Sequence, residues 1–143
     1  MEFTSLTVES IIENFSKVKD WLQAIFDKLG CQGKQNKQLF IAVDEIFTNI
    51  SKYAYTNTEN GKGIVSLKAM FDNNNNILKI VFKDNGIEYN PLYKEDPDIP
   101  KHIEQRTIGG LGIFMAKKMV DSIYYVREDD KNTLTLNKKM ILS

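Results

Sequence analysis

The sequence predicts an α+β fold, a two-layer sandwich in which helices cover one face of a mixed, mostly antiparallel sheet. Two long segments in the first 55 residues carry apolar side chains at helical spacing, and most later segments are short, strand-like and paired by turn sequences. Strands and helices do not alternate regularly, as they would in a doubly wound parallel fold. A length of 143 residues is typical of one domain, so we expect residues 1–143 to fold as a single unit.

The first half of the chain predicts one strand and two helices. Residues 3–8 alternate weakly between polar and apolar and predict a strand, after which Ser10 could cap a helix that runs to Leu29 and stops at Gly30. A second helix is predicted over residues 35–55. The apolar residues that follow the helical period are Phe15, Val18, Leu22, Ile25 and Leu29 in the first helix and Phe40, Val43, Phe47, Ile50 and Ala54 in the second.

Two hairpins and a third helix are predicted in the second half. Residues 64–71 and 77–83 are strand-like and are joined by Asp72 and four asparagines, which is a strong turn signal. Residues 91–108 hold all three prolines without a sustained period and predict a long loop. The remaining predicted elements are a helix from the glycines at 109–112 to about Val120, and strands at 122–127 and 133–139 around a turn at 129–132.

Composition and charge narrow the class of protein. Basic and acidic residues each number 19, so no basic surface for nucleic acid or anionic membranes is indicated. Cys31 is the only cysteine, which suits a reducing compartment, and the lone His102 argues against a His-rich metal site or a Ser/His/Asp triad. No signal-peptide pattern or bilayer-length apolar run is present. We therefore expect a cytoplasmic protein that binds neither nucleic acid nor membrane directly.

Three polar side chains interrupt the apolar pattern of the second predicted helix. Glu45, Asn49 and Lys52 are spaced i, i+4 and i+7, so they fall on one narrow stripe of the helix. One interpretation is a solvated face with a weak contact between Glu45 and Asn49. The other is a functional site, and spacing alone leaves both open.

Two glycine-containing segments offer ligand-binding groups. Gly109, Gly110 and Gly112 precede a helix, where uncrowded backbone amides and the helix dipole can bind phosphates. Asp84 and Gly86 end an apolar strand, where a carboxylate can accept a hydrogen bond from the exocyclic amine of a purine. Taken singly, the first segment could be only a flexible turn with a helix cap, and the second an ordinary Asp-Asn-Gly turn.

Together, the three segments resemble a known family in both order and spacing. DEIFTNISKYAY resembles the N box, FKDNGIEYNPL the first glycine box, RTIGGLGIFMAKKMVD the second glycine box and NTLTLNKK the final strand of the Bergerat-fold ATPases. The likeness covers nearly the whole chain. Within that superfamily, the chain is most similar to the anti-sigma-factor serine/threonine kinases of bacterial partner-switching systems. The resemblance implies the histidine kinase-like ATPase fold.

The resemblance also implies the cofactors, ATP and Mg²⁺, and the roles of single residues. Asn49 matches the asparagine that holds Mg²⁺, Asp84 matches the aspartate that reads the adenine amine, and residues 91–108 match a lid over ATP. Lys52 is implied near the phosphates and Tyr53 near the adenine. The positions implied at the nucleotide are Asn49, Lys52, Tyr53, Asp84, Gly86, Gly109, Gly110, Leu111 and Gly112.

Glu45 distinguishes a serine kinase from a histidine kinase. Histidine kinases, whose acceptor imidazole is already a nucleophile, commonly have asparagine at this position. A serine hydroxyl has a pKa far above neutrality and benefits from a carboxylate that accepts its proton. Glu45 is therefore predicted to be the catalytic base, and a histidine-kinase fragment is disfavoured.

The predicted function is that of an ATP-dependent serine/threonine protein kinase that acts as an anti-sigma factor and phosphorylates an anti-sigma factor antagonist of the STAS type. A sigma factor is a further implied partner. Homodimerisation is expected by resemblance, with the first strand and helix as the candidate interface, although the apolar face from Phe15 to Leu29 could equally serve only the core. The chain reads Gly86-Ile87-Glu88 where the superfamily often has a second glycine. This departure motivates the alternative, a non-catalytic module of the same fold that regulates a partner by sequestration.

Overall fold

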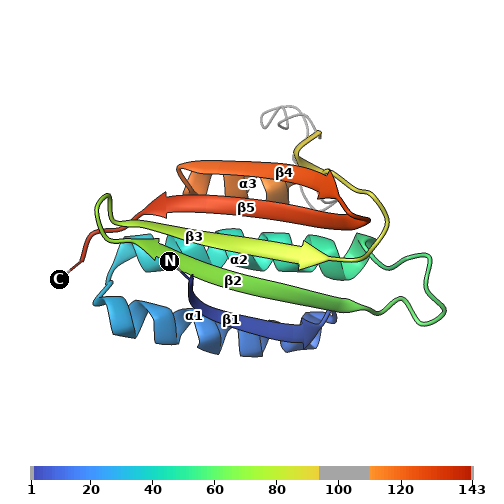
Figure 1. Ribbon diagram of the computed structural model, residues 1–143, viewed down its shortest axis with the longest axis horizontal. Coiled ribbons are helices and arrows are strands. Elements are labelled where there is room, and N and C mark those ends of the chain that lie inside the picture. The colour runs from blue at the N-terminus through green and yellow to red at the C-terminus, as the bar shows by residue number, and fades with distance from the viewer. Residues whose placement is uncertain (1, 94–109, 143) are drawn as a thin grey trace.

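The structure is a computed structural model that describes residues 2–93 and 110–142. Five strands form one sheet in the order β1-β2-β3-β5-β4, with every neighbouring pair antiparallel, and the helices lie on one face of it (Figure 1). The strands are β1 (Glu2–Glu9), β2 (Ile64–Asp72), β3 (Ile77–Asp84), β4 (Ser122–Glu128) and β5 (Lys131–Lys139). The helices are α1 (Phe15–Leu29), α2 (Lys34–Tyr53) and α3 (Gly110–Met119), with short 3-10 helices η1 (Ile12–Asn14) and η2 (Pro91–Tyr93). The predicted α+β sandwich is confirmed.

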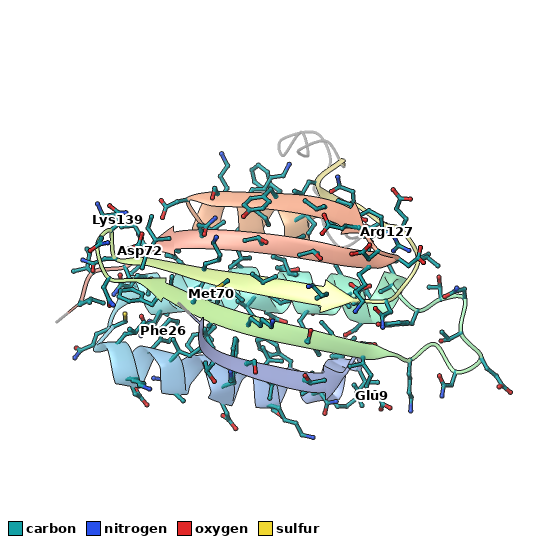
Figure 2. All side chains as sticks on the ribbon, viewed as in Figure 1. Glu9, Phe26, Met70, Asp72, Arg127 and Lys139 are labelled. Atoms are coloured by element: carbon teal, nitrogen blue, oxygen red, sulfur yellow. The ribbon has the colours of Figure 1, made fainter. Side chains whose placement is uncertain are left out.

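The hydrophobic core fills the space between the sheet and the helices. Phe26 of α1 points from its helix toward the sheet (Figure 2), and Phe47 of α2 and Phe82 of β3 are also fully buried. On α2, the buried apolar residues are Leu39, Ala42, Val43, Ile46 and Phe47. Phe40 and Ile50, which were predicted to face the core, are only partly buried against it. The buried arc of α2 is therefore rotated and wider than the predicted stripe.

Ser10 does not cap the first helix, which corrects the prediction. α1 begins only at Phe15, after η1, and its N-cap residue Asn14 makes no side-chain capping bond. Instead, Ser10 N donates to Gly63 O at 2.8 Å and Ser10 Oγ accepts from Gly63 N at 3.1 Å. These bonds tie the end of β1 to the start of β2. The predicted stop at Gly30 is confirmed by its left-handed conformation, with φ of 75°.

The last hairpin has a shorter turn than the predicted one over residues 129–132. Its turn consists of Asp129 and Asp130, which have φ values of 54° and 58°, as a two-residue type I′ turn requires. β5 therefore begins at Lys131, and Asn132 lies in the strand opposite Asp84 of β3. Placing Asn132 in the turn was wrong.

The predicted lid and the second glycine segment lie partly outside the described residues. η2 covers residues 91–93, whereas the rest of the predicted lid, His102 and Gly109 lie outside the described residues. Within the described ranges, no helix combines the length and the apolar character needed to cross a bilayer.

Candidate active site

Asn49 is a buried amide on α2 with an unpaired oxygen. Its side chain is 7% exposed, and its Nδ2 donates to Glu45 O at 2.8 Å. No donor among residues 2–93 and 110–142 reaches its Oδ1. A buried acceptor without a partner costs about 1–3 kcal/mol. An oxygen held in this way fits a ligand for a hard cation such as Mg²⁺.

Two of the three members of the polar stripe of α2 are withdrawn from solvent, so the solvated-face interpretation is wrong for them. α3 packs along α2, Asn49 is buried and Glu45 is half-buried, whereas Lys52 is exposed. The predicted contact between Glu45 and Asn49 runs to the backbone oxygen of Glu45, not to its carboxylate. The carboxylate remains available for other partners.

The Glu45 carboxylate lies against the first turn of α3. A Cβ added to Gly112 would overlap Glu45 Oε2, so only glycine admits this contact without a shift. Burial raises the pKa of Glu45, the nearby charge of Asp44 raises it further, and Lys52 opposes both effects. A carboxylate with a raised pKa is a better proton acceptor near neutral pH than an ordinary surface glutamate. Gly110 begins α3, and Leu111 lies in its first turn.

Asp84 ends β3 as a buried carboxylate with one saturated oxygen. Its side chain is 5% exposed, and its Oδ1 accepts from Gly86 N and from Asn132 Nδ2, each at 2.9 Å. Burial raises the pKa of Asp84, while the bonds from Asn132 and Gly86 and the charge of Arg127 lower it. The carboxylate is thus an acceptor held by neutral donors.

Gly86 allows the segment after β3 to pass close to the end of α2. A Cβ at this position would overlap the Ala54 carbonyl, and Ile87 N donates to Ala54 O at 2.8 Å. This close approach joins the strand that carries Asp84 to the helix that carries Asn49.

Asn49 and Asp84, two residues that the family resemblance implies at the nucleotide, line the same cavity. The cavity has a volume of about 20 Å³, is mostly apolar, and is bordered by Tyr89 and Pro91. That volume suits one water molecule and is too small for a purine ring. Tyr53 lies beside the cavity through its ring contact with Tyr89, at a centroid distance of 5.3 Å.

A larger hollow of about 610 Å³ lies at the opposite end of the sheet, lined in part by Asp72, Lys79 and Lys139. None of the predicted site residues that the structure describes lines it. Of the two hollows, the smaller cavity is the one that Asn49 and Asp84 line.

Residues 8–138 match the model of the histidine kinase-like ATPase domain. The chain belongs to this family. Among curated relatives of this histidine kinase-like ATPase, the serine-protein kinase RsbW of Bacillus licheniformis is 30% identical over 122 residues, covering 82% of this chain and 73% of the relative. The serine-protein kinase RsbW of Staphylococcus aureus is 28% identical over 131 residues, covering 89% and 80%. These relatives confirm the predicted family and the prediction of a serine/threonine protein kinase.

Two solved structures share the fold of this histidine kinase-like ATPase. The RsbU and RsbW domains of a Mycobacterium tuberculosis protein match with a TM-score of 0.65 at 13% identity, covering 96% of this chain and 33% of that one. The histidine kinase domain of a blue-light activated kinase from Erythrobacter litoralis matches with a TM-score of 0.55 at 16% identity, covering 90% and 60%. This chain thus spans a third and three fifths of those structures, and the likeness extends to the fold alone.

Three residues of the site in this histidine kinase-like ATPase were not predicted from the sequence. Asn132 bonds to Asp84, Ala54 receives the segment after β3, and Tyr89 borders the cavity. Only Asn132 had a readable signal, because Asp129-Asp130 tolerates the positive φ of a two-residue turn and so places Asn132 in the strand.

Proposed function

We propose that this kinase uses Mg²⁺ and ATP to phosphorylate a serine or threonine of an anti-sigma factor antagonist of the STAS type, and that it acts as an anti-sigma factor by binding a sigma factor. A cytoplasmic location is part of this proposal, because sigma factors act there. The arrangement of Glu45 and Asn49 on successive turns of α2 carries the proposal. Glu45 supplies a carboxylate of raised pKa, and Asn49 supplies a buried oxygen without a protein donor in the described ranges.

The residues of the chain fit the two cofactors. Asn49 would ligate Mg²⁺, which supplies charge neutralisation for the transferring phosphoryl group. The backbone amides of Gly110 and Gly112 at the start of α3 would bind phosphate oxygens, and Asp84 would accept a hydrogen bond from the adenine amine. Lys52 is exposed beside Glu45 and would approach the phosphates from the solvent side.

Glu45 would act as the general base toward the acceptor protein. As the acceptor oxygen bonds to the γ-phosphorus, the bond from that phosphorus to the β,γ-bridging oxygen breaks and ADP leaves. The hydroxyl proton passes to the Glu45 carboxylate. Burial and Asp44 favour this transfer because they raise the affinity of Glu45 for a proton.

Calorimetric titration with ATP, with and without Mg²⁺, tests the cofactor site. We expect Mg²⁺-dependent binding that is lost in Asn49→Ala and retained in Asn137→Ala, a control that removes a half-buried amide on β5 bonded to Ser122 Oγ. Binding that is equally strong in Asn49→Ala would contradict the magnesium role of Asn49.

Phosphoryl transfer to a recombinant antagonist from the same genome tests the base. We expect Glu45→Gln to bind Mg²⁺ and ATP normally and to transfer phosphate far more slowly. A Glu45→Gln variant that transfers at the native rate would refute the assignment of Glu45.

The second candidate function is the non-catalytic sequestering module, and the small cavity between Asn49 and Asp84 favours it. It predicts stable partner complexes without phosphate on the partner. Absence of binding at millimolar ATP would favour this module, whereas phosphoserine on the partner, detected by mass spectrometry, would exclude it.

Homodimerisation through β1 and α1 is also proposed. β1 is an edge strand of the sheet, so one side of its backbone can pair with another strand. Sedimentation of the chain with Ser5→Pro in β1 tests this interface, because proline removes a donor from the edge. A dimer unaffected by the substitution would place the interface elsewhere.

A further inference from the structure

Asn132 lies at the centre of a buried hydrogen-bond network at the end of β3. It pairs with Asp84 across β3 and β5, and both side chains are 5% exposed. Its Nδ2 donates to Asp84 Oδ1 at 2.9 Å and to Ile87 O at 2.7 Å. Both amide hydrogens therefore have acceptors.

The electrostatics around Asn132 fix the orientation of its amide. Its Oδ1 accepts from Tyr125 Oη and from Arg127 Nη1, the latter at 3.2 Å. A reversed amide would turn an oxygen toward the Asp84 carboxylate and an NH₂ group toward the guanidinium, and both contacts would be repulsive. Figure 2 shows Arg127 at the end of the sheet opposite Asp72 and Lys139. The network therefore lies at the end of the sheet where β3 ends at Asp84.

Arg127 supports this network without occupying the Asp84 carboxylate. Its Nη1 donates to Gly86 O at 2.8 Å and to Asn132 Oδ1. Asp84 Oδ1 already has two donors, Gly86 N and Asn132 Nδ2. In the described part of the chain, no hydrogen bond runs to Asp84 Oδ2. One oxygen is saturated by the protein, and the other is left for a ligand.

We propose that Asn132 is the positioning residue that sets the nucleobase preference of this site, because by saturating Asp84 Oδ1 it leaves Oδ2 as an acceptor for the 6-amino group of adenine. The same oxygen repels the 6-oxo group of guanine, which is also an acceptor. This inference rests on the proposed function, since it needs a nucleotide at Asp84.

The protonation of Asp84 supports the same role. Burial raises the pKa of Asp84, and the bond from Asn132 is the largest influence that lowers it. Without that bond, the carboxyl group takes up a proton more readily. A protonated Asp84 can donate to the 6-oxo group of guanine, so the preference for adenine falls.

Calorimetric titration with ATP and GTP in the presence of Mg²⁺ tests the inference. We expect Asn132→Ala to lower the ratio of ATP to GTP affinity about tenfold, the size of one lost charge-assisted hydrogen bond. Asn137→Ala on the same strand is the matched control, because its half-buried amide bonds only to Ser122 Oγ among the side chains described, and it should keep the native ratio. Equal losses of ATP and GTP affinity in Asn132→Ala would overturn the inference.

Asn132→Asp gives a second test, because a purely structural role of Asn132 would not make the ATP affinity of this variant depend on pH. At high pH two carboxylates would face each other, whereas at lower pH the introduced carboxyl group, once protonated, could again donate to Asp84. We expect the ATP affinity of this variant, relative to the unmodified chain at the same pH, to rise as the pH falls from about 8 to about 6. The other titratable groups around this pair are Tyr55, Glu88, Tyr125 and Arg127.

The two proposals fail in different ways. A flat relative affinity of Asn132→Asp across that pH range would overturn the role of Asn132 while leaving the nucleotide site in place. Failure of the unmodified chain to bind either ATP or GTP would overturn the proposed function and this inference together.

Discussion

The carboxylate of Glu45 rests against Gly112, so the helix proposed to bind phosphates is also the wall that positions the proposed base. Glu45 belongs to α2 and Gly112 to α3, and the absence of a side chain at Gly112 is what allows the contact. Phosphate binding and base positioning are therefore coupled through one glycine. The coupling makes this glycine important even if its amide never touches a ligand.

Gly112→Ala should lower the rate of phosphoryl transfer without lowering the stability of the chain. The added methyl group meets the end of a flexible side chain, so Glu45 moves and α3 does not. Alanine also favours the helix by about 0.5–1 kcal/mol over glycine. We expect an unchanged or slightly higher melting temperature and a transfer rate lower by on the order of tenfold or more, since general base catalysis contributes at least that much.

Thermal unfolding and single-turnover phosphoryl transfer measure the two effects of Gly112→Ala. Lys118→Ala, an exposed change on the same helix, serves as the control and should alter neither. A variant with native transfer would mean that the observed position of Glu45 is not needed for the reaction.

The pH dependence of transfer should respond oppositely to two charge changes. Transfer requires ionised Glu45, so its rate falls as pH drops through the pKa of that group. Asp44 raises this pKa and Lys52 lowers it. Asp44→Asn should therefore move the acid limb of the rate profile to lower pH, and Lys52→Gln should move it to higher pH. The amide introduced by Asp44→Asn would keep an acceptor for Thr48 Oγ1, which now donates to Asp44 Oδ1 at 3.2 Å.

Rate profiles at low ionic strength show these shifts most clearly, because screening is weakest there. Asp20→Asn on the exposed side of α1 is the control and should leave the profile in place. Shifts of the same sign in both variants would mean that another group limits the rate at low pH.

The sequence revealed the residues whose patterns are local. Helical spacing predicted that Glu45 and Asn49 share one face of a helix, and both lie on α2. The apolar run before Asp84 predicted that this residue ends a strand, and it is the last residue of β3. The burial of Asn49 could not be predicted, because the residues that line its cavity, such as Asp84 and Tyr89, come from distant parts of the chain.

Residues whose role depends on register were missed. Asn132 meets Asp84 only because the last turn has two residues rather than four, which shifts the start of β5. Ser10 was predicted to cap a helix because serine is common at the N-cap position. Instead, its backbone and hydroxyl groups form hydrogen bonds with the backbone of Gly63. Pairing between distant strands decided both cases. The Asp129-Asp130 pair could have placed Asn132 in a strand, but no local pattern shows that its partner is Asp84.

Asn49→Leu should stabilise the nucleotide-free chain and abolish its function. Leucine removes the unpaired Oδ1, whose burial costs about 1–3 kcal/mol, while Glu45 O keeps its helical hydrogen bond. We expect the melting temperature without nucleotide to rise by a few degrees and Mg²⁺-dependent ATP binding to vanish.

Asn36→Leu provides a matched comparison for Asn49→Leu. Asn36 is also on α2 and also has a buried Oδ1 without a donor in the described ranges, but it lies near Cys31, away from the site. It should leave ATP binding intact. Loss of stability in Asn49→Leu would show that the Asn49 amide contributes more through its bond to Glu45 O than it loses through burial.

Lys138→Met should destabilise the chain through the end of α3. Lys138 is 8% exposed, and its Nζ donates to Met119 O at 2.6 Å and to Gln38 Oε1 at 3.1 Å. Methionine has a similar length but no donor, so the last carbonyl of α3 and the Gln38 amide oxygen lose their partner at a cost of about 1–3 kcal/mol. We expect a melting temperature lower by several degrees.

ATP affinity of Lys138→Met should fall as well. The two bonds of Lys138 hold the end of α3 to α2, and α3 carries Gly110 and Gly112. Lys139→Met, the exposed neighbour on β5, should change neither quantity, and an equal effect of the two variants would mean that the buried amine does not anchor α3.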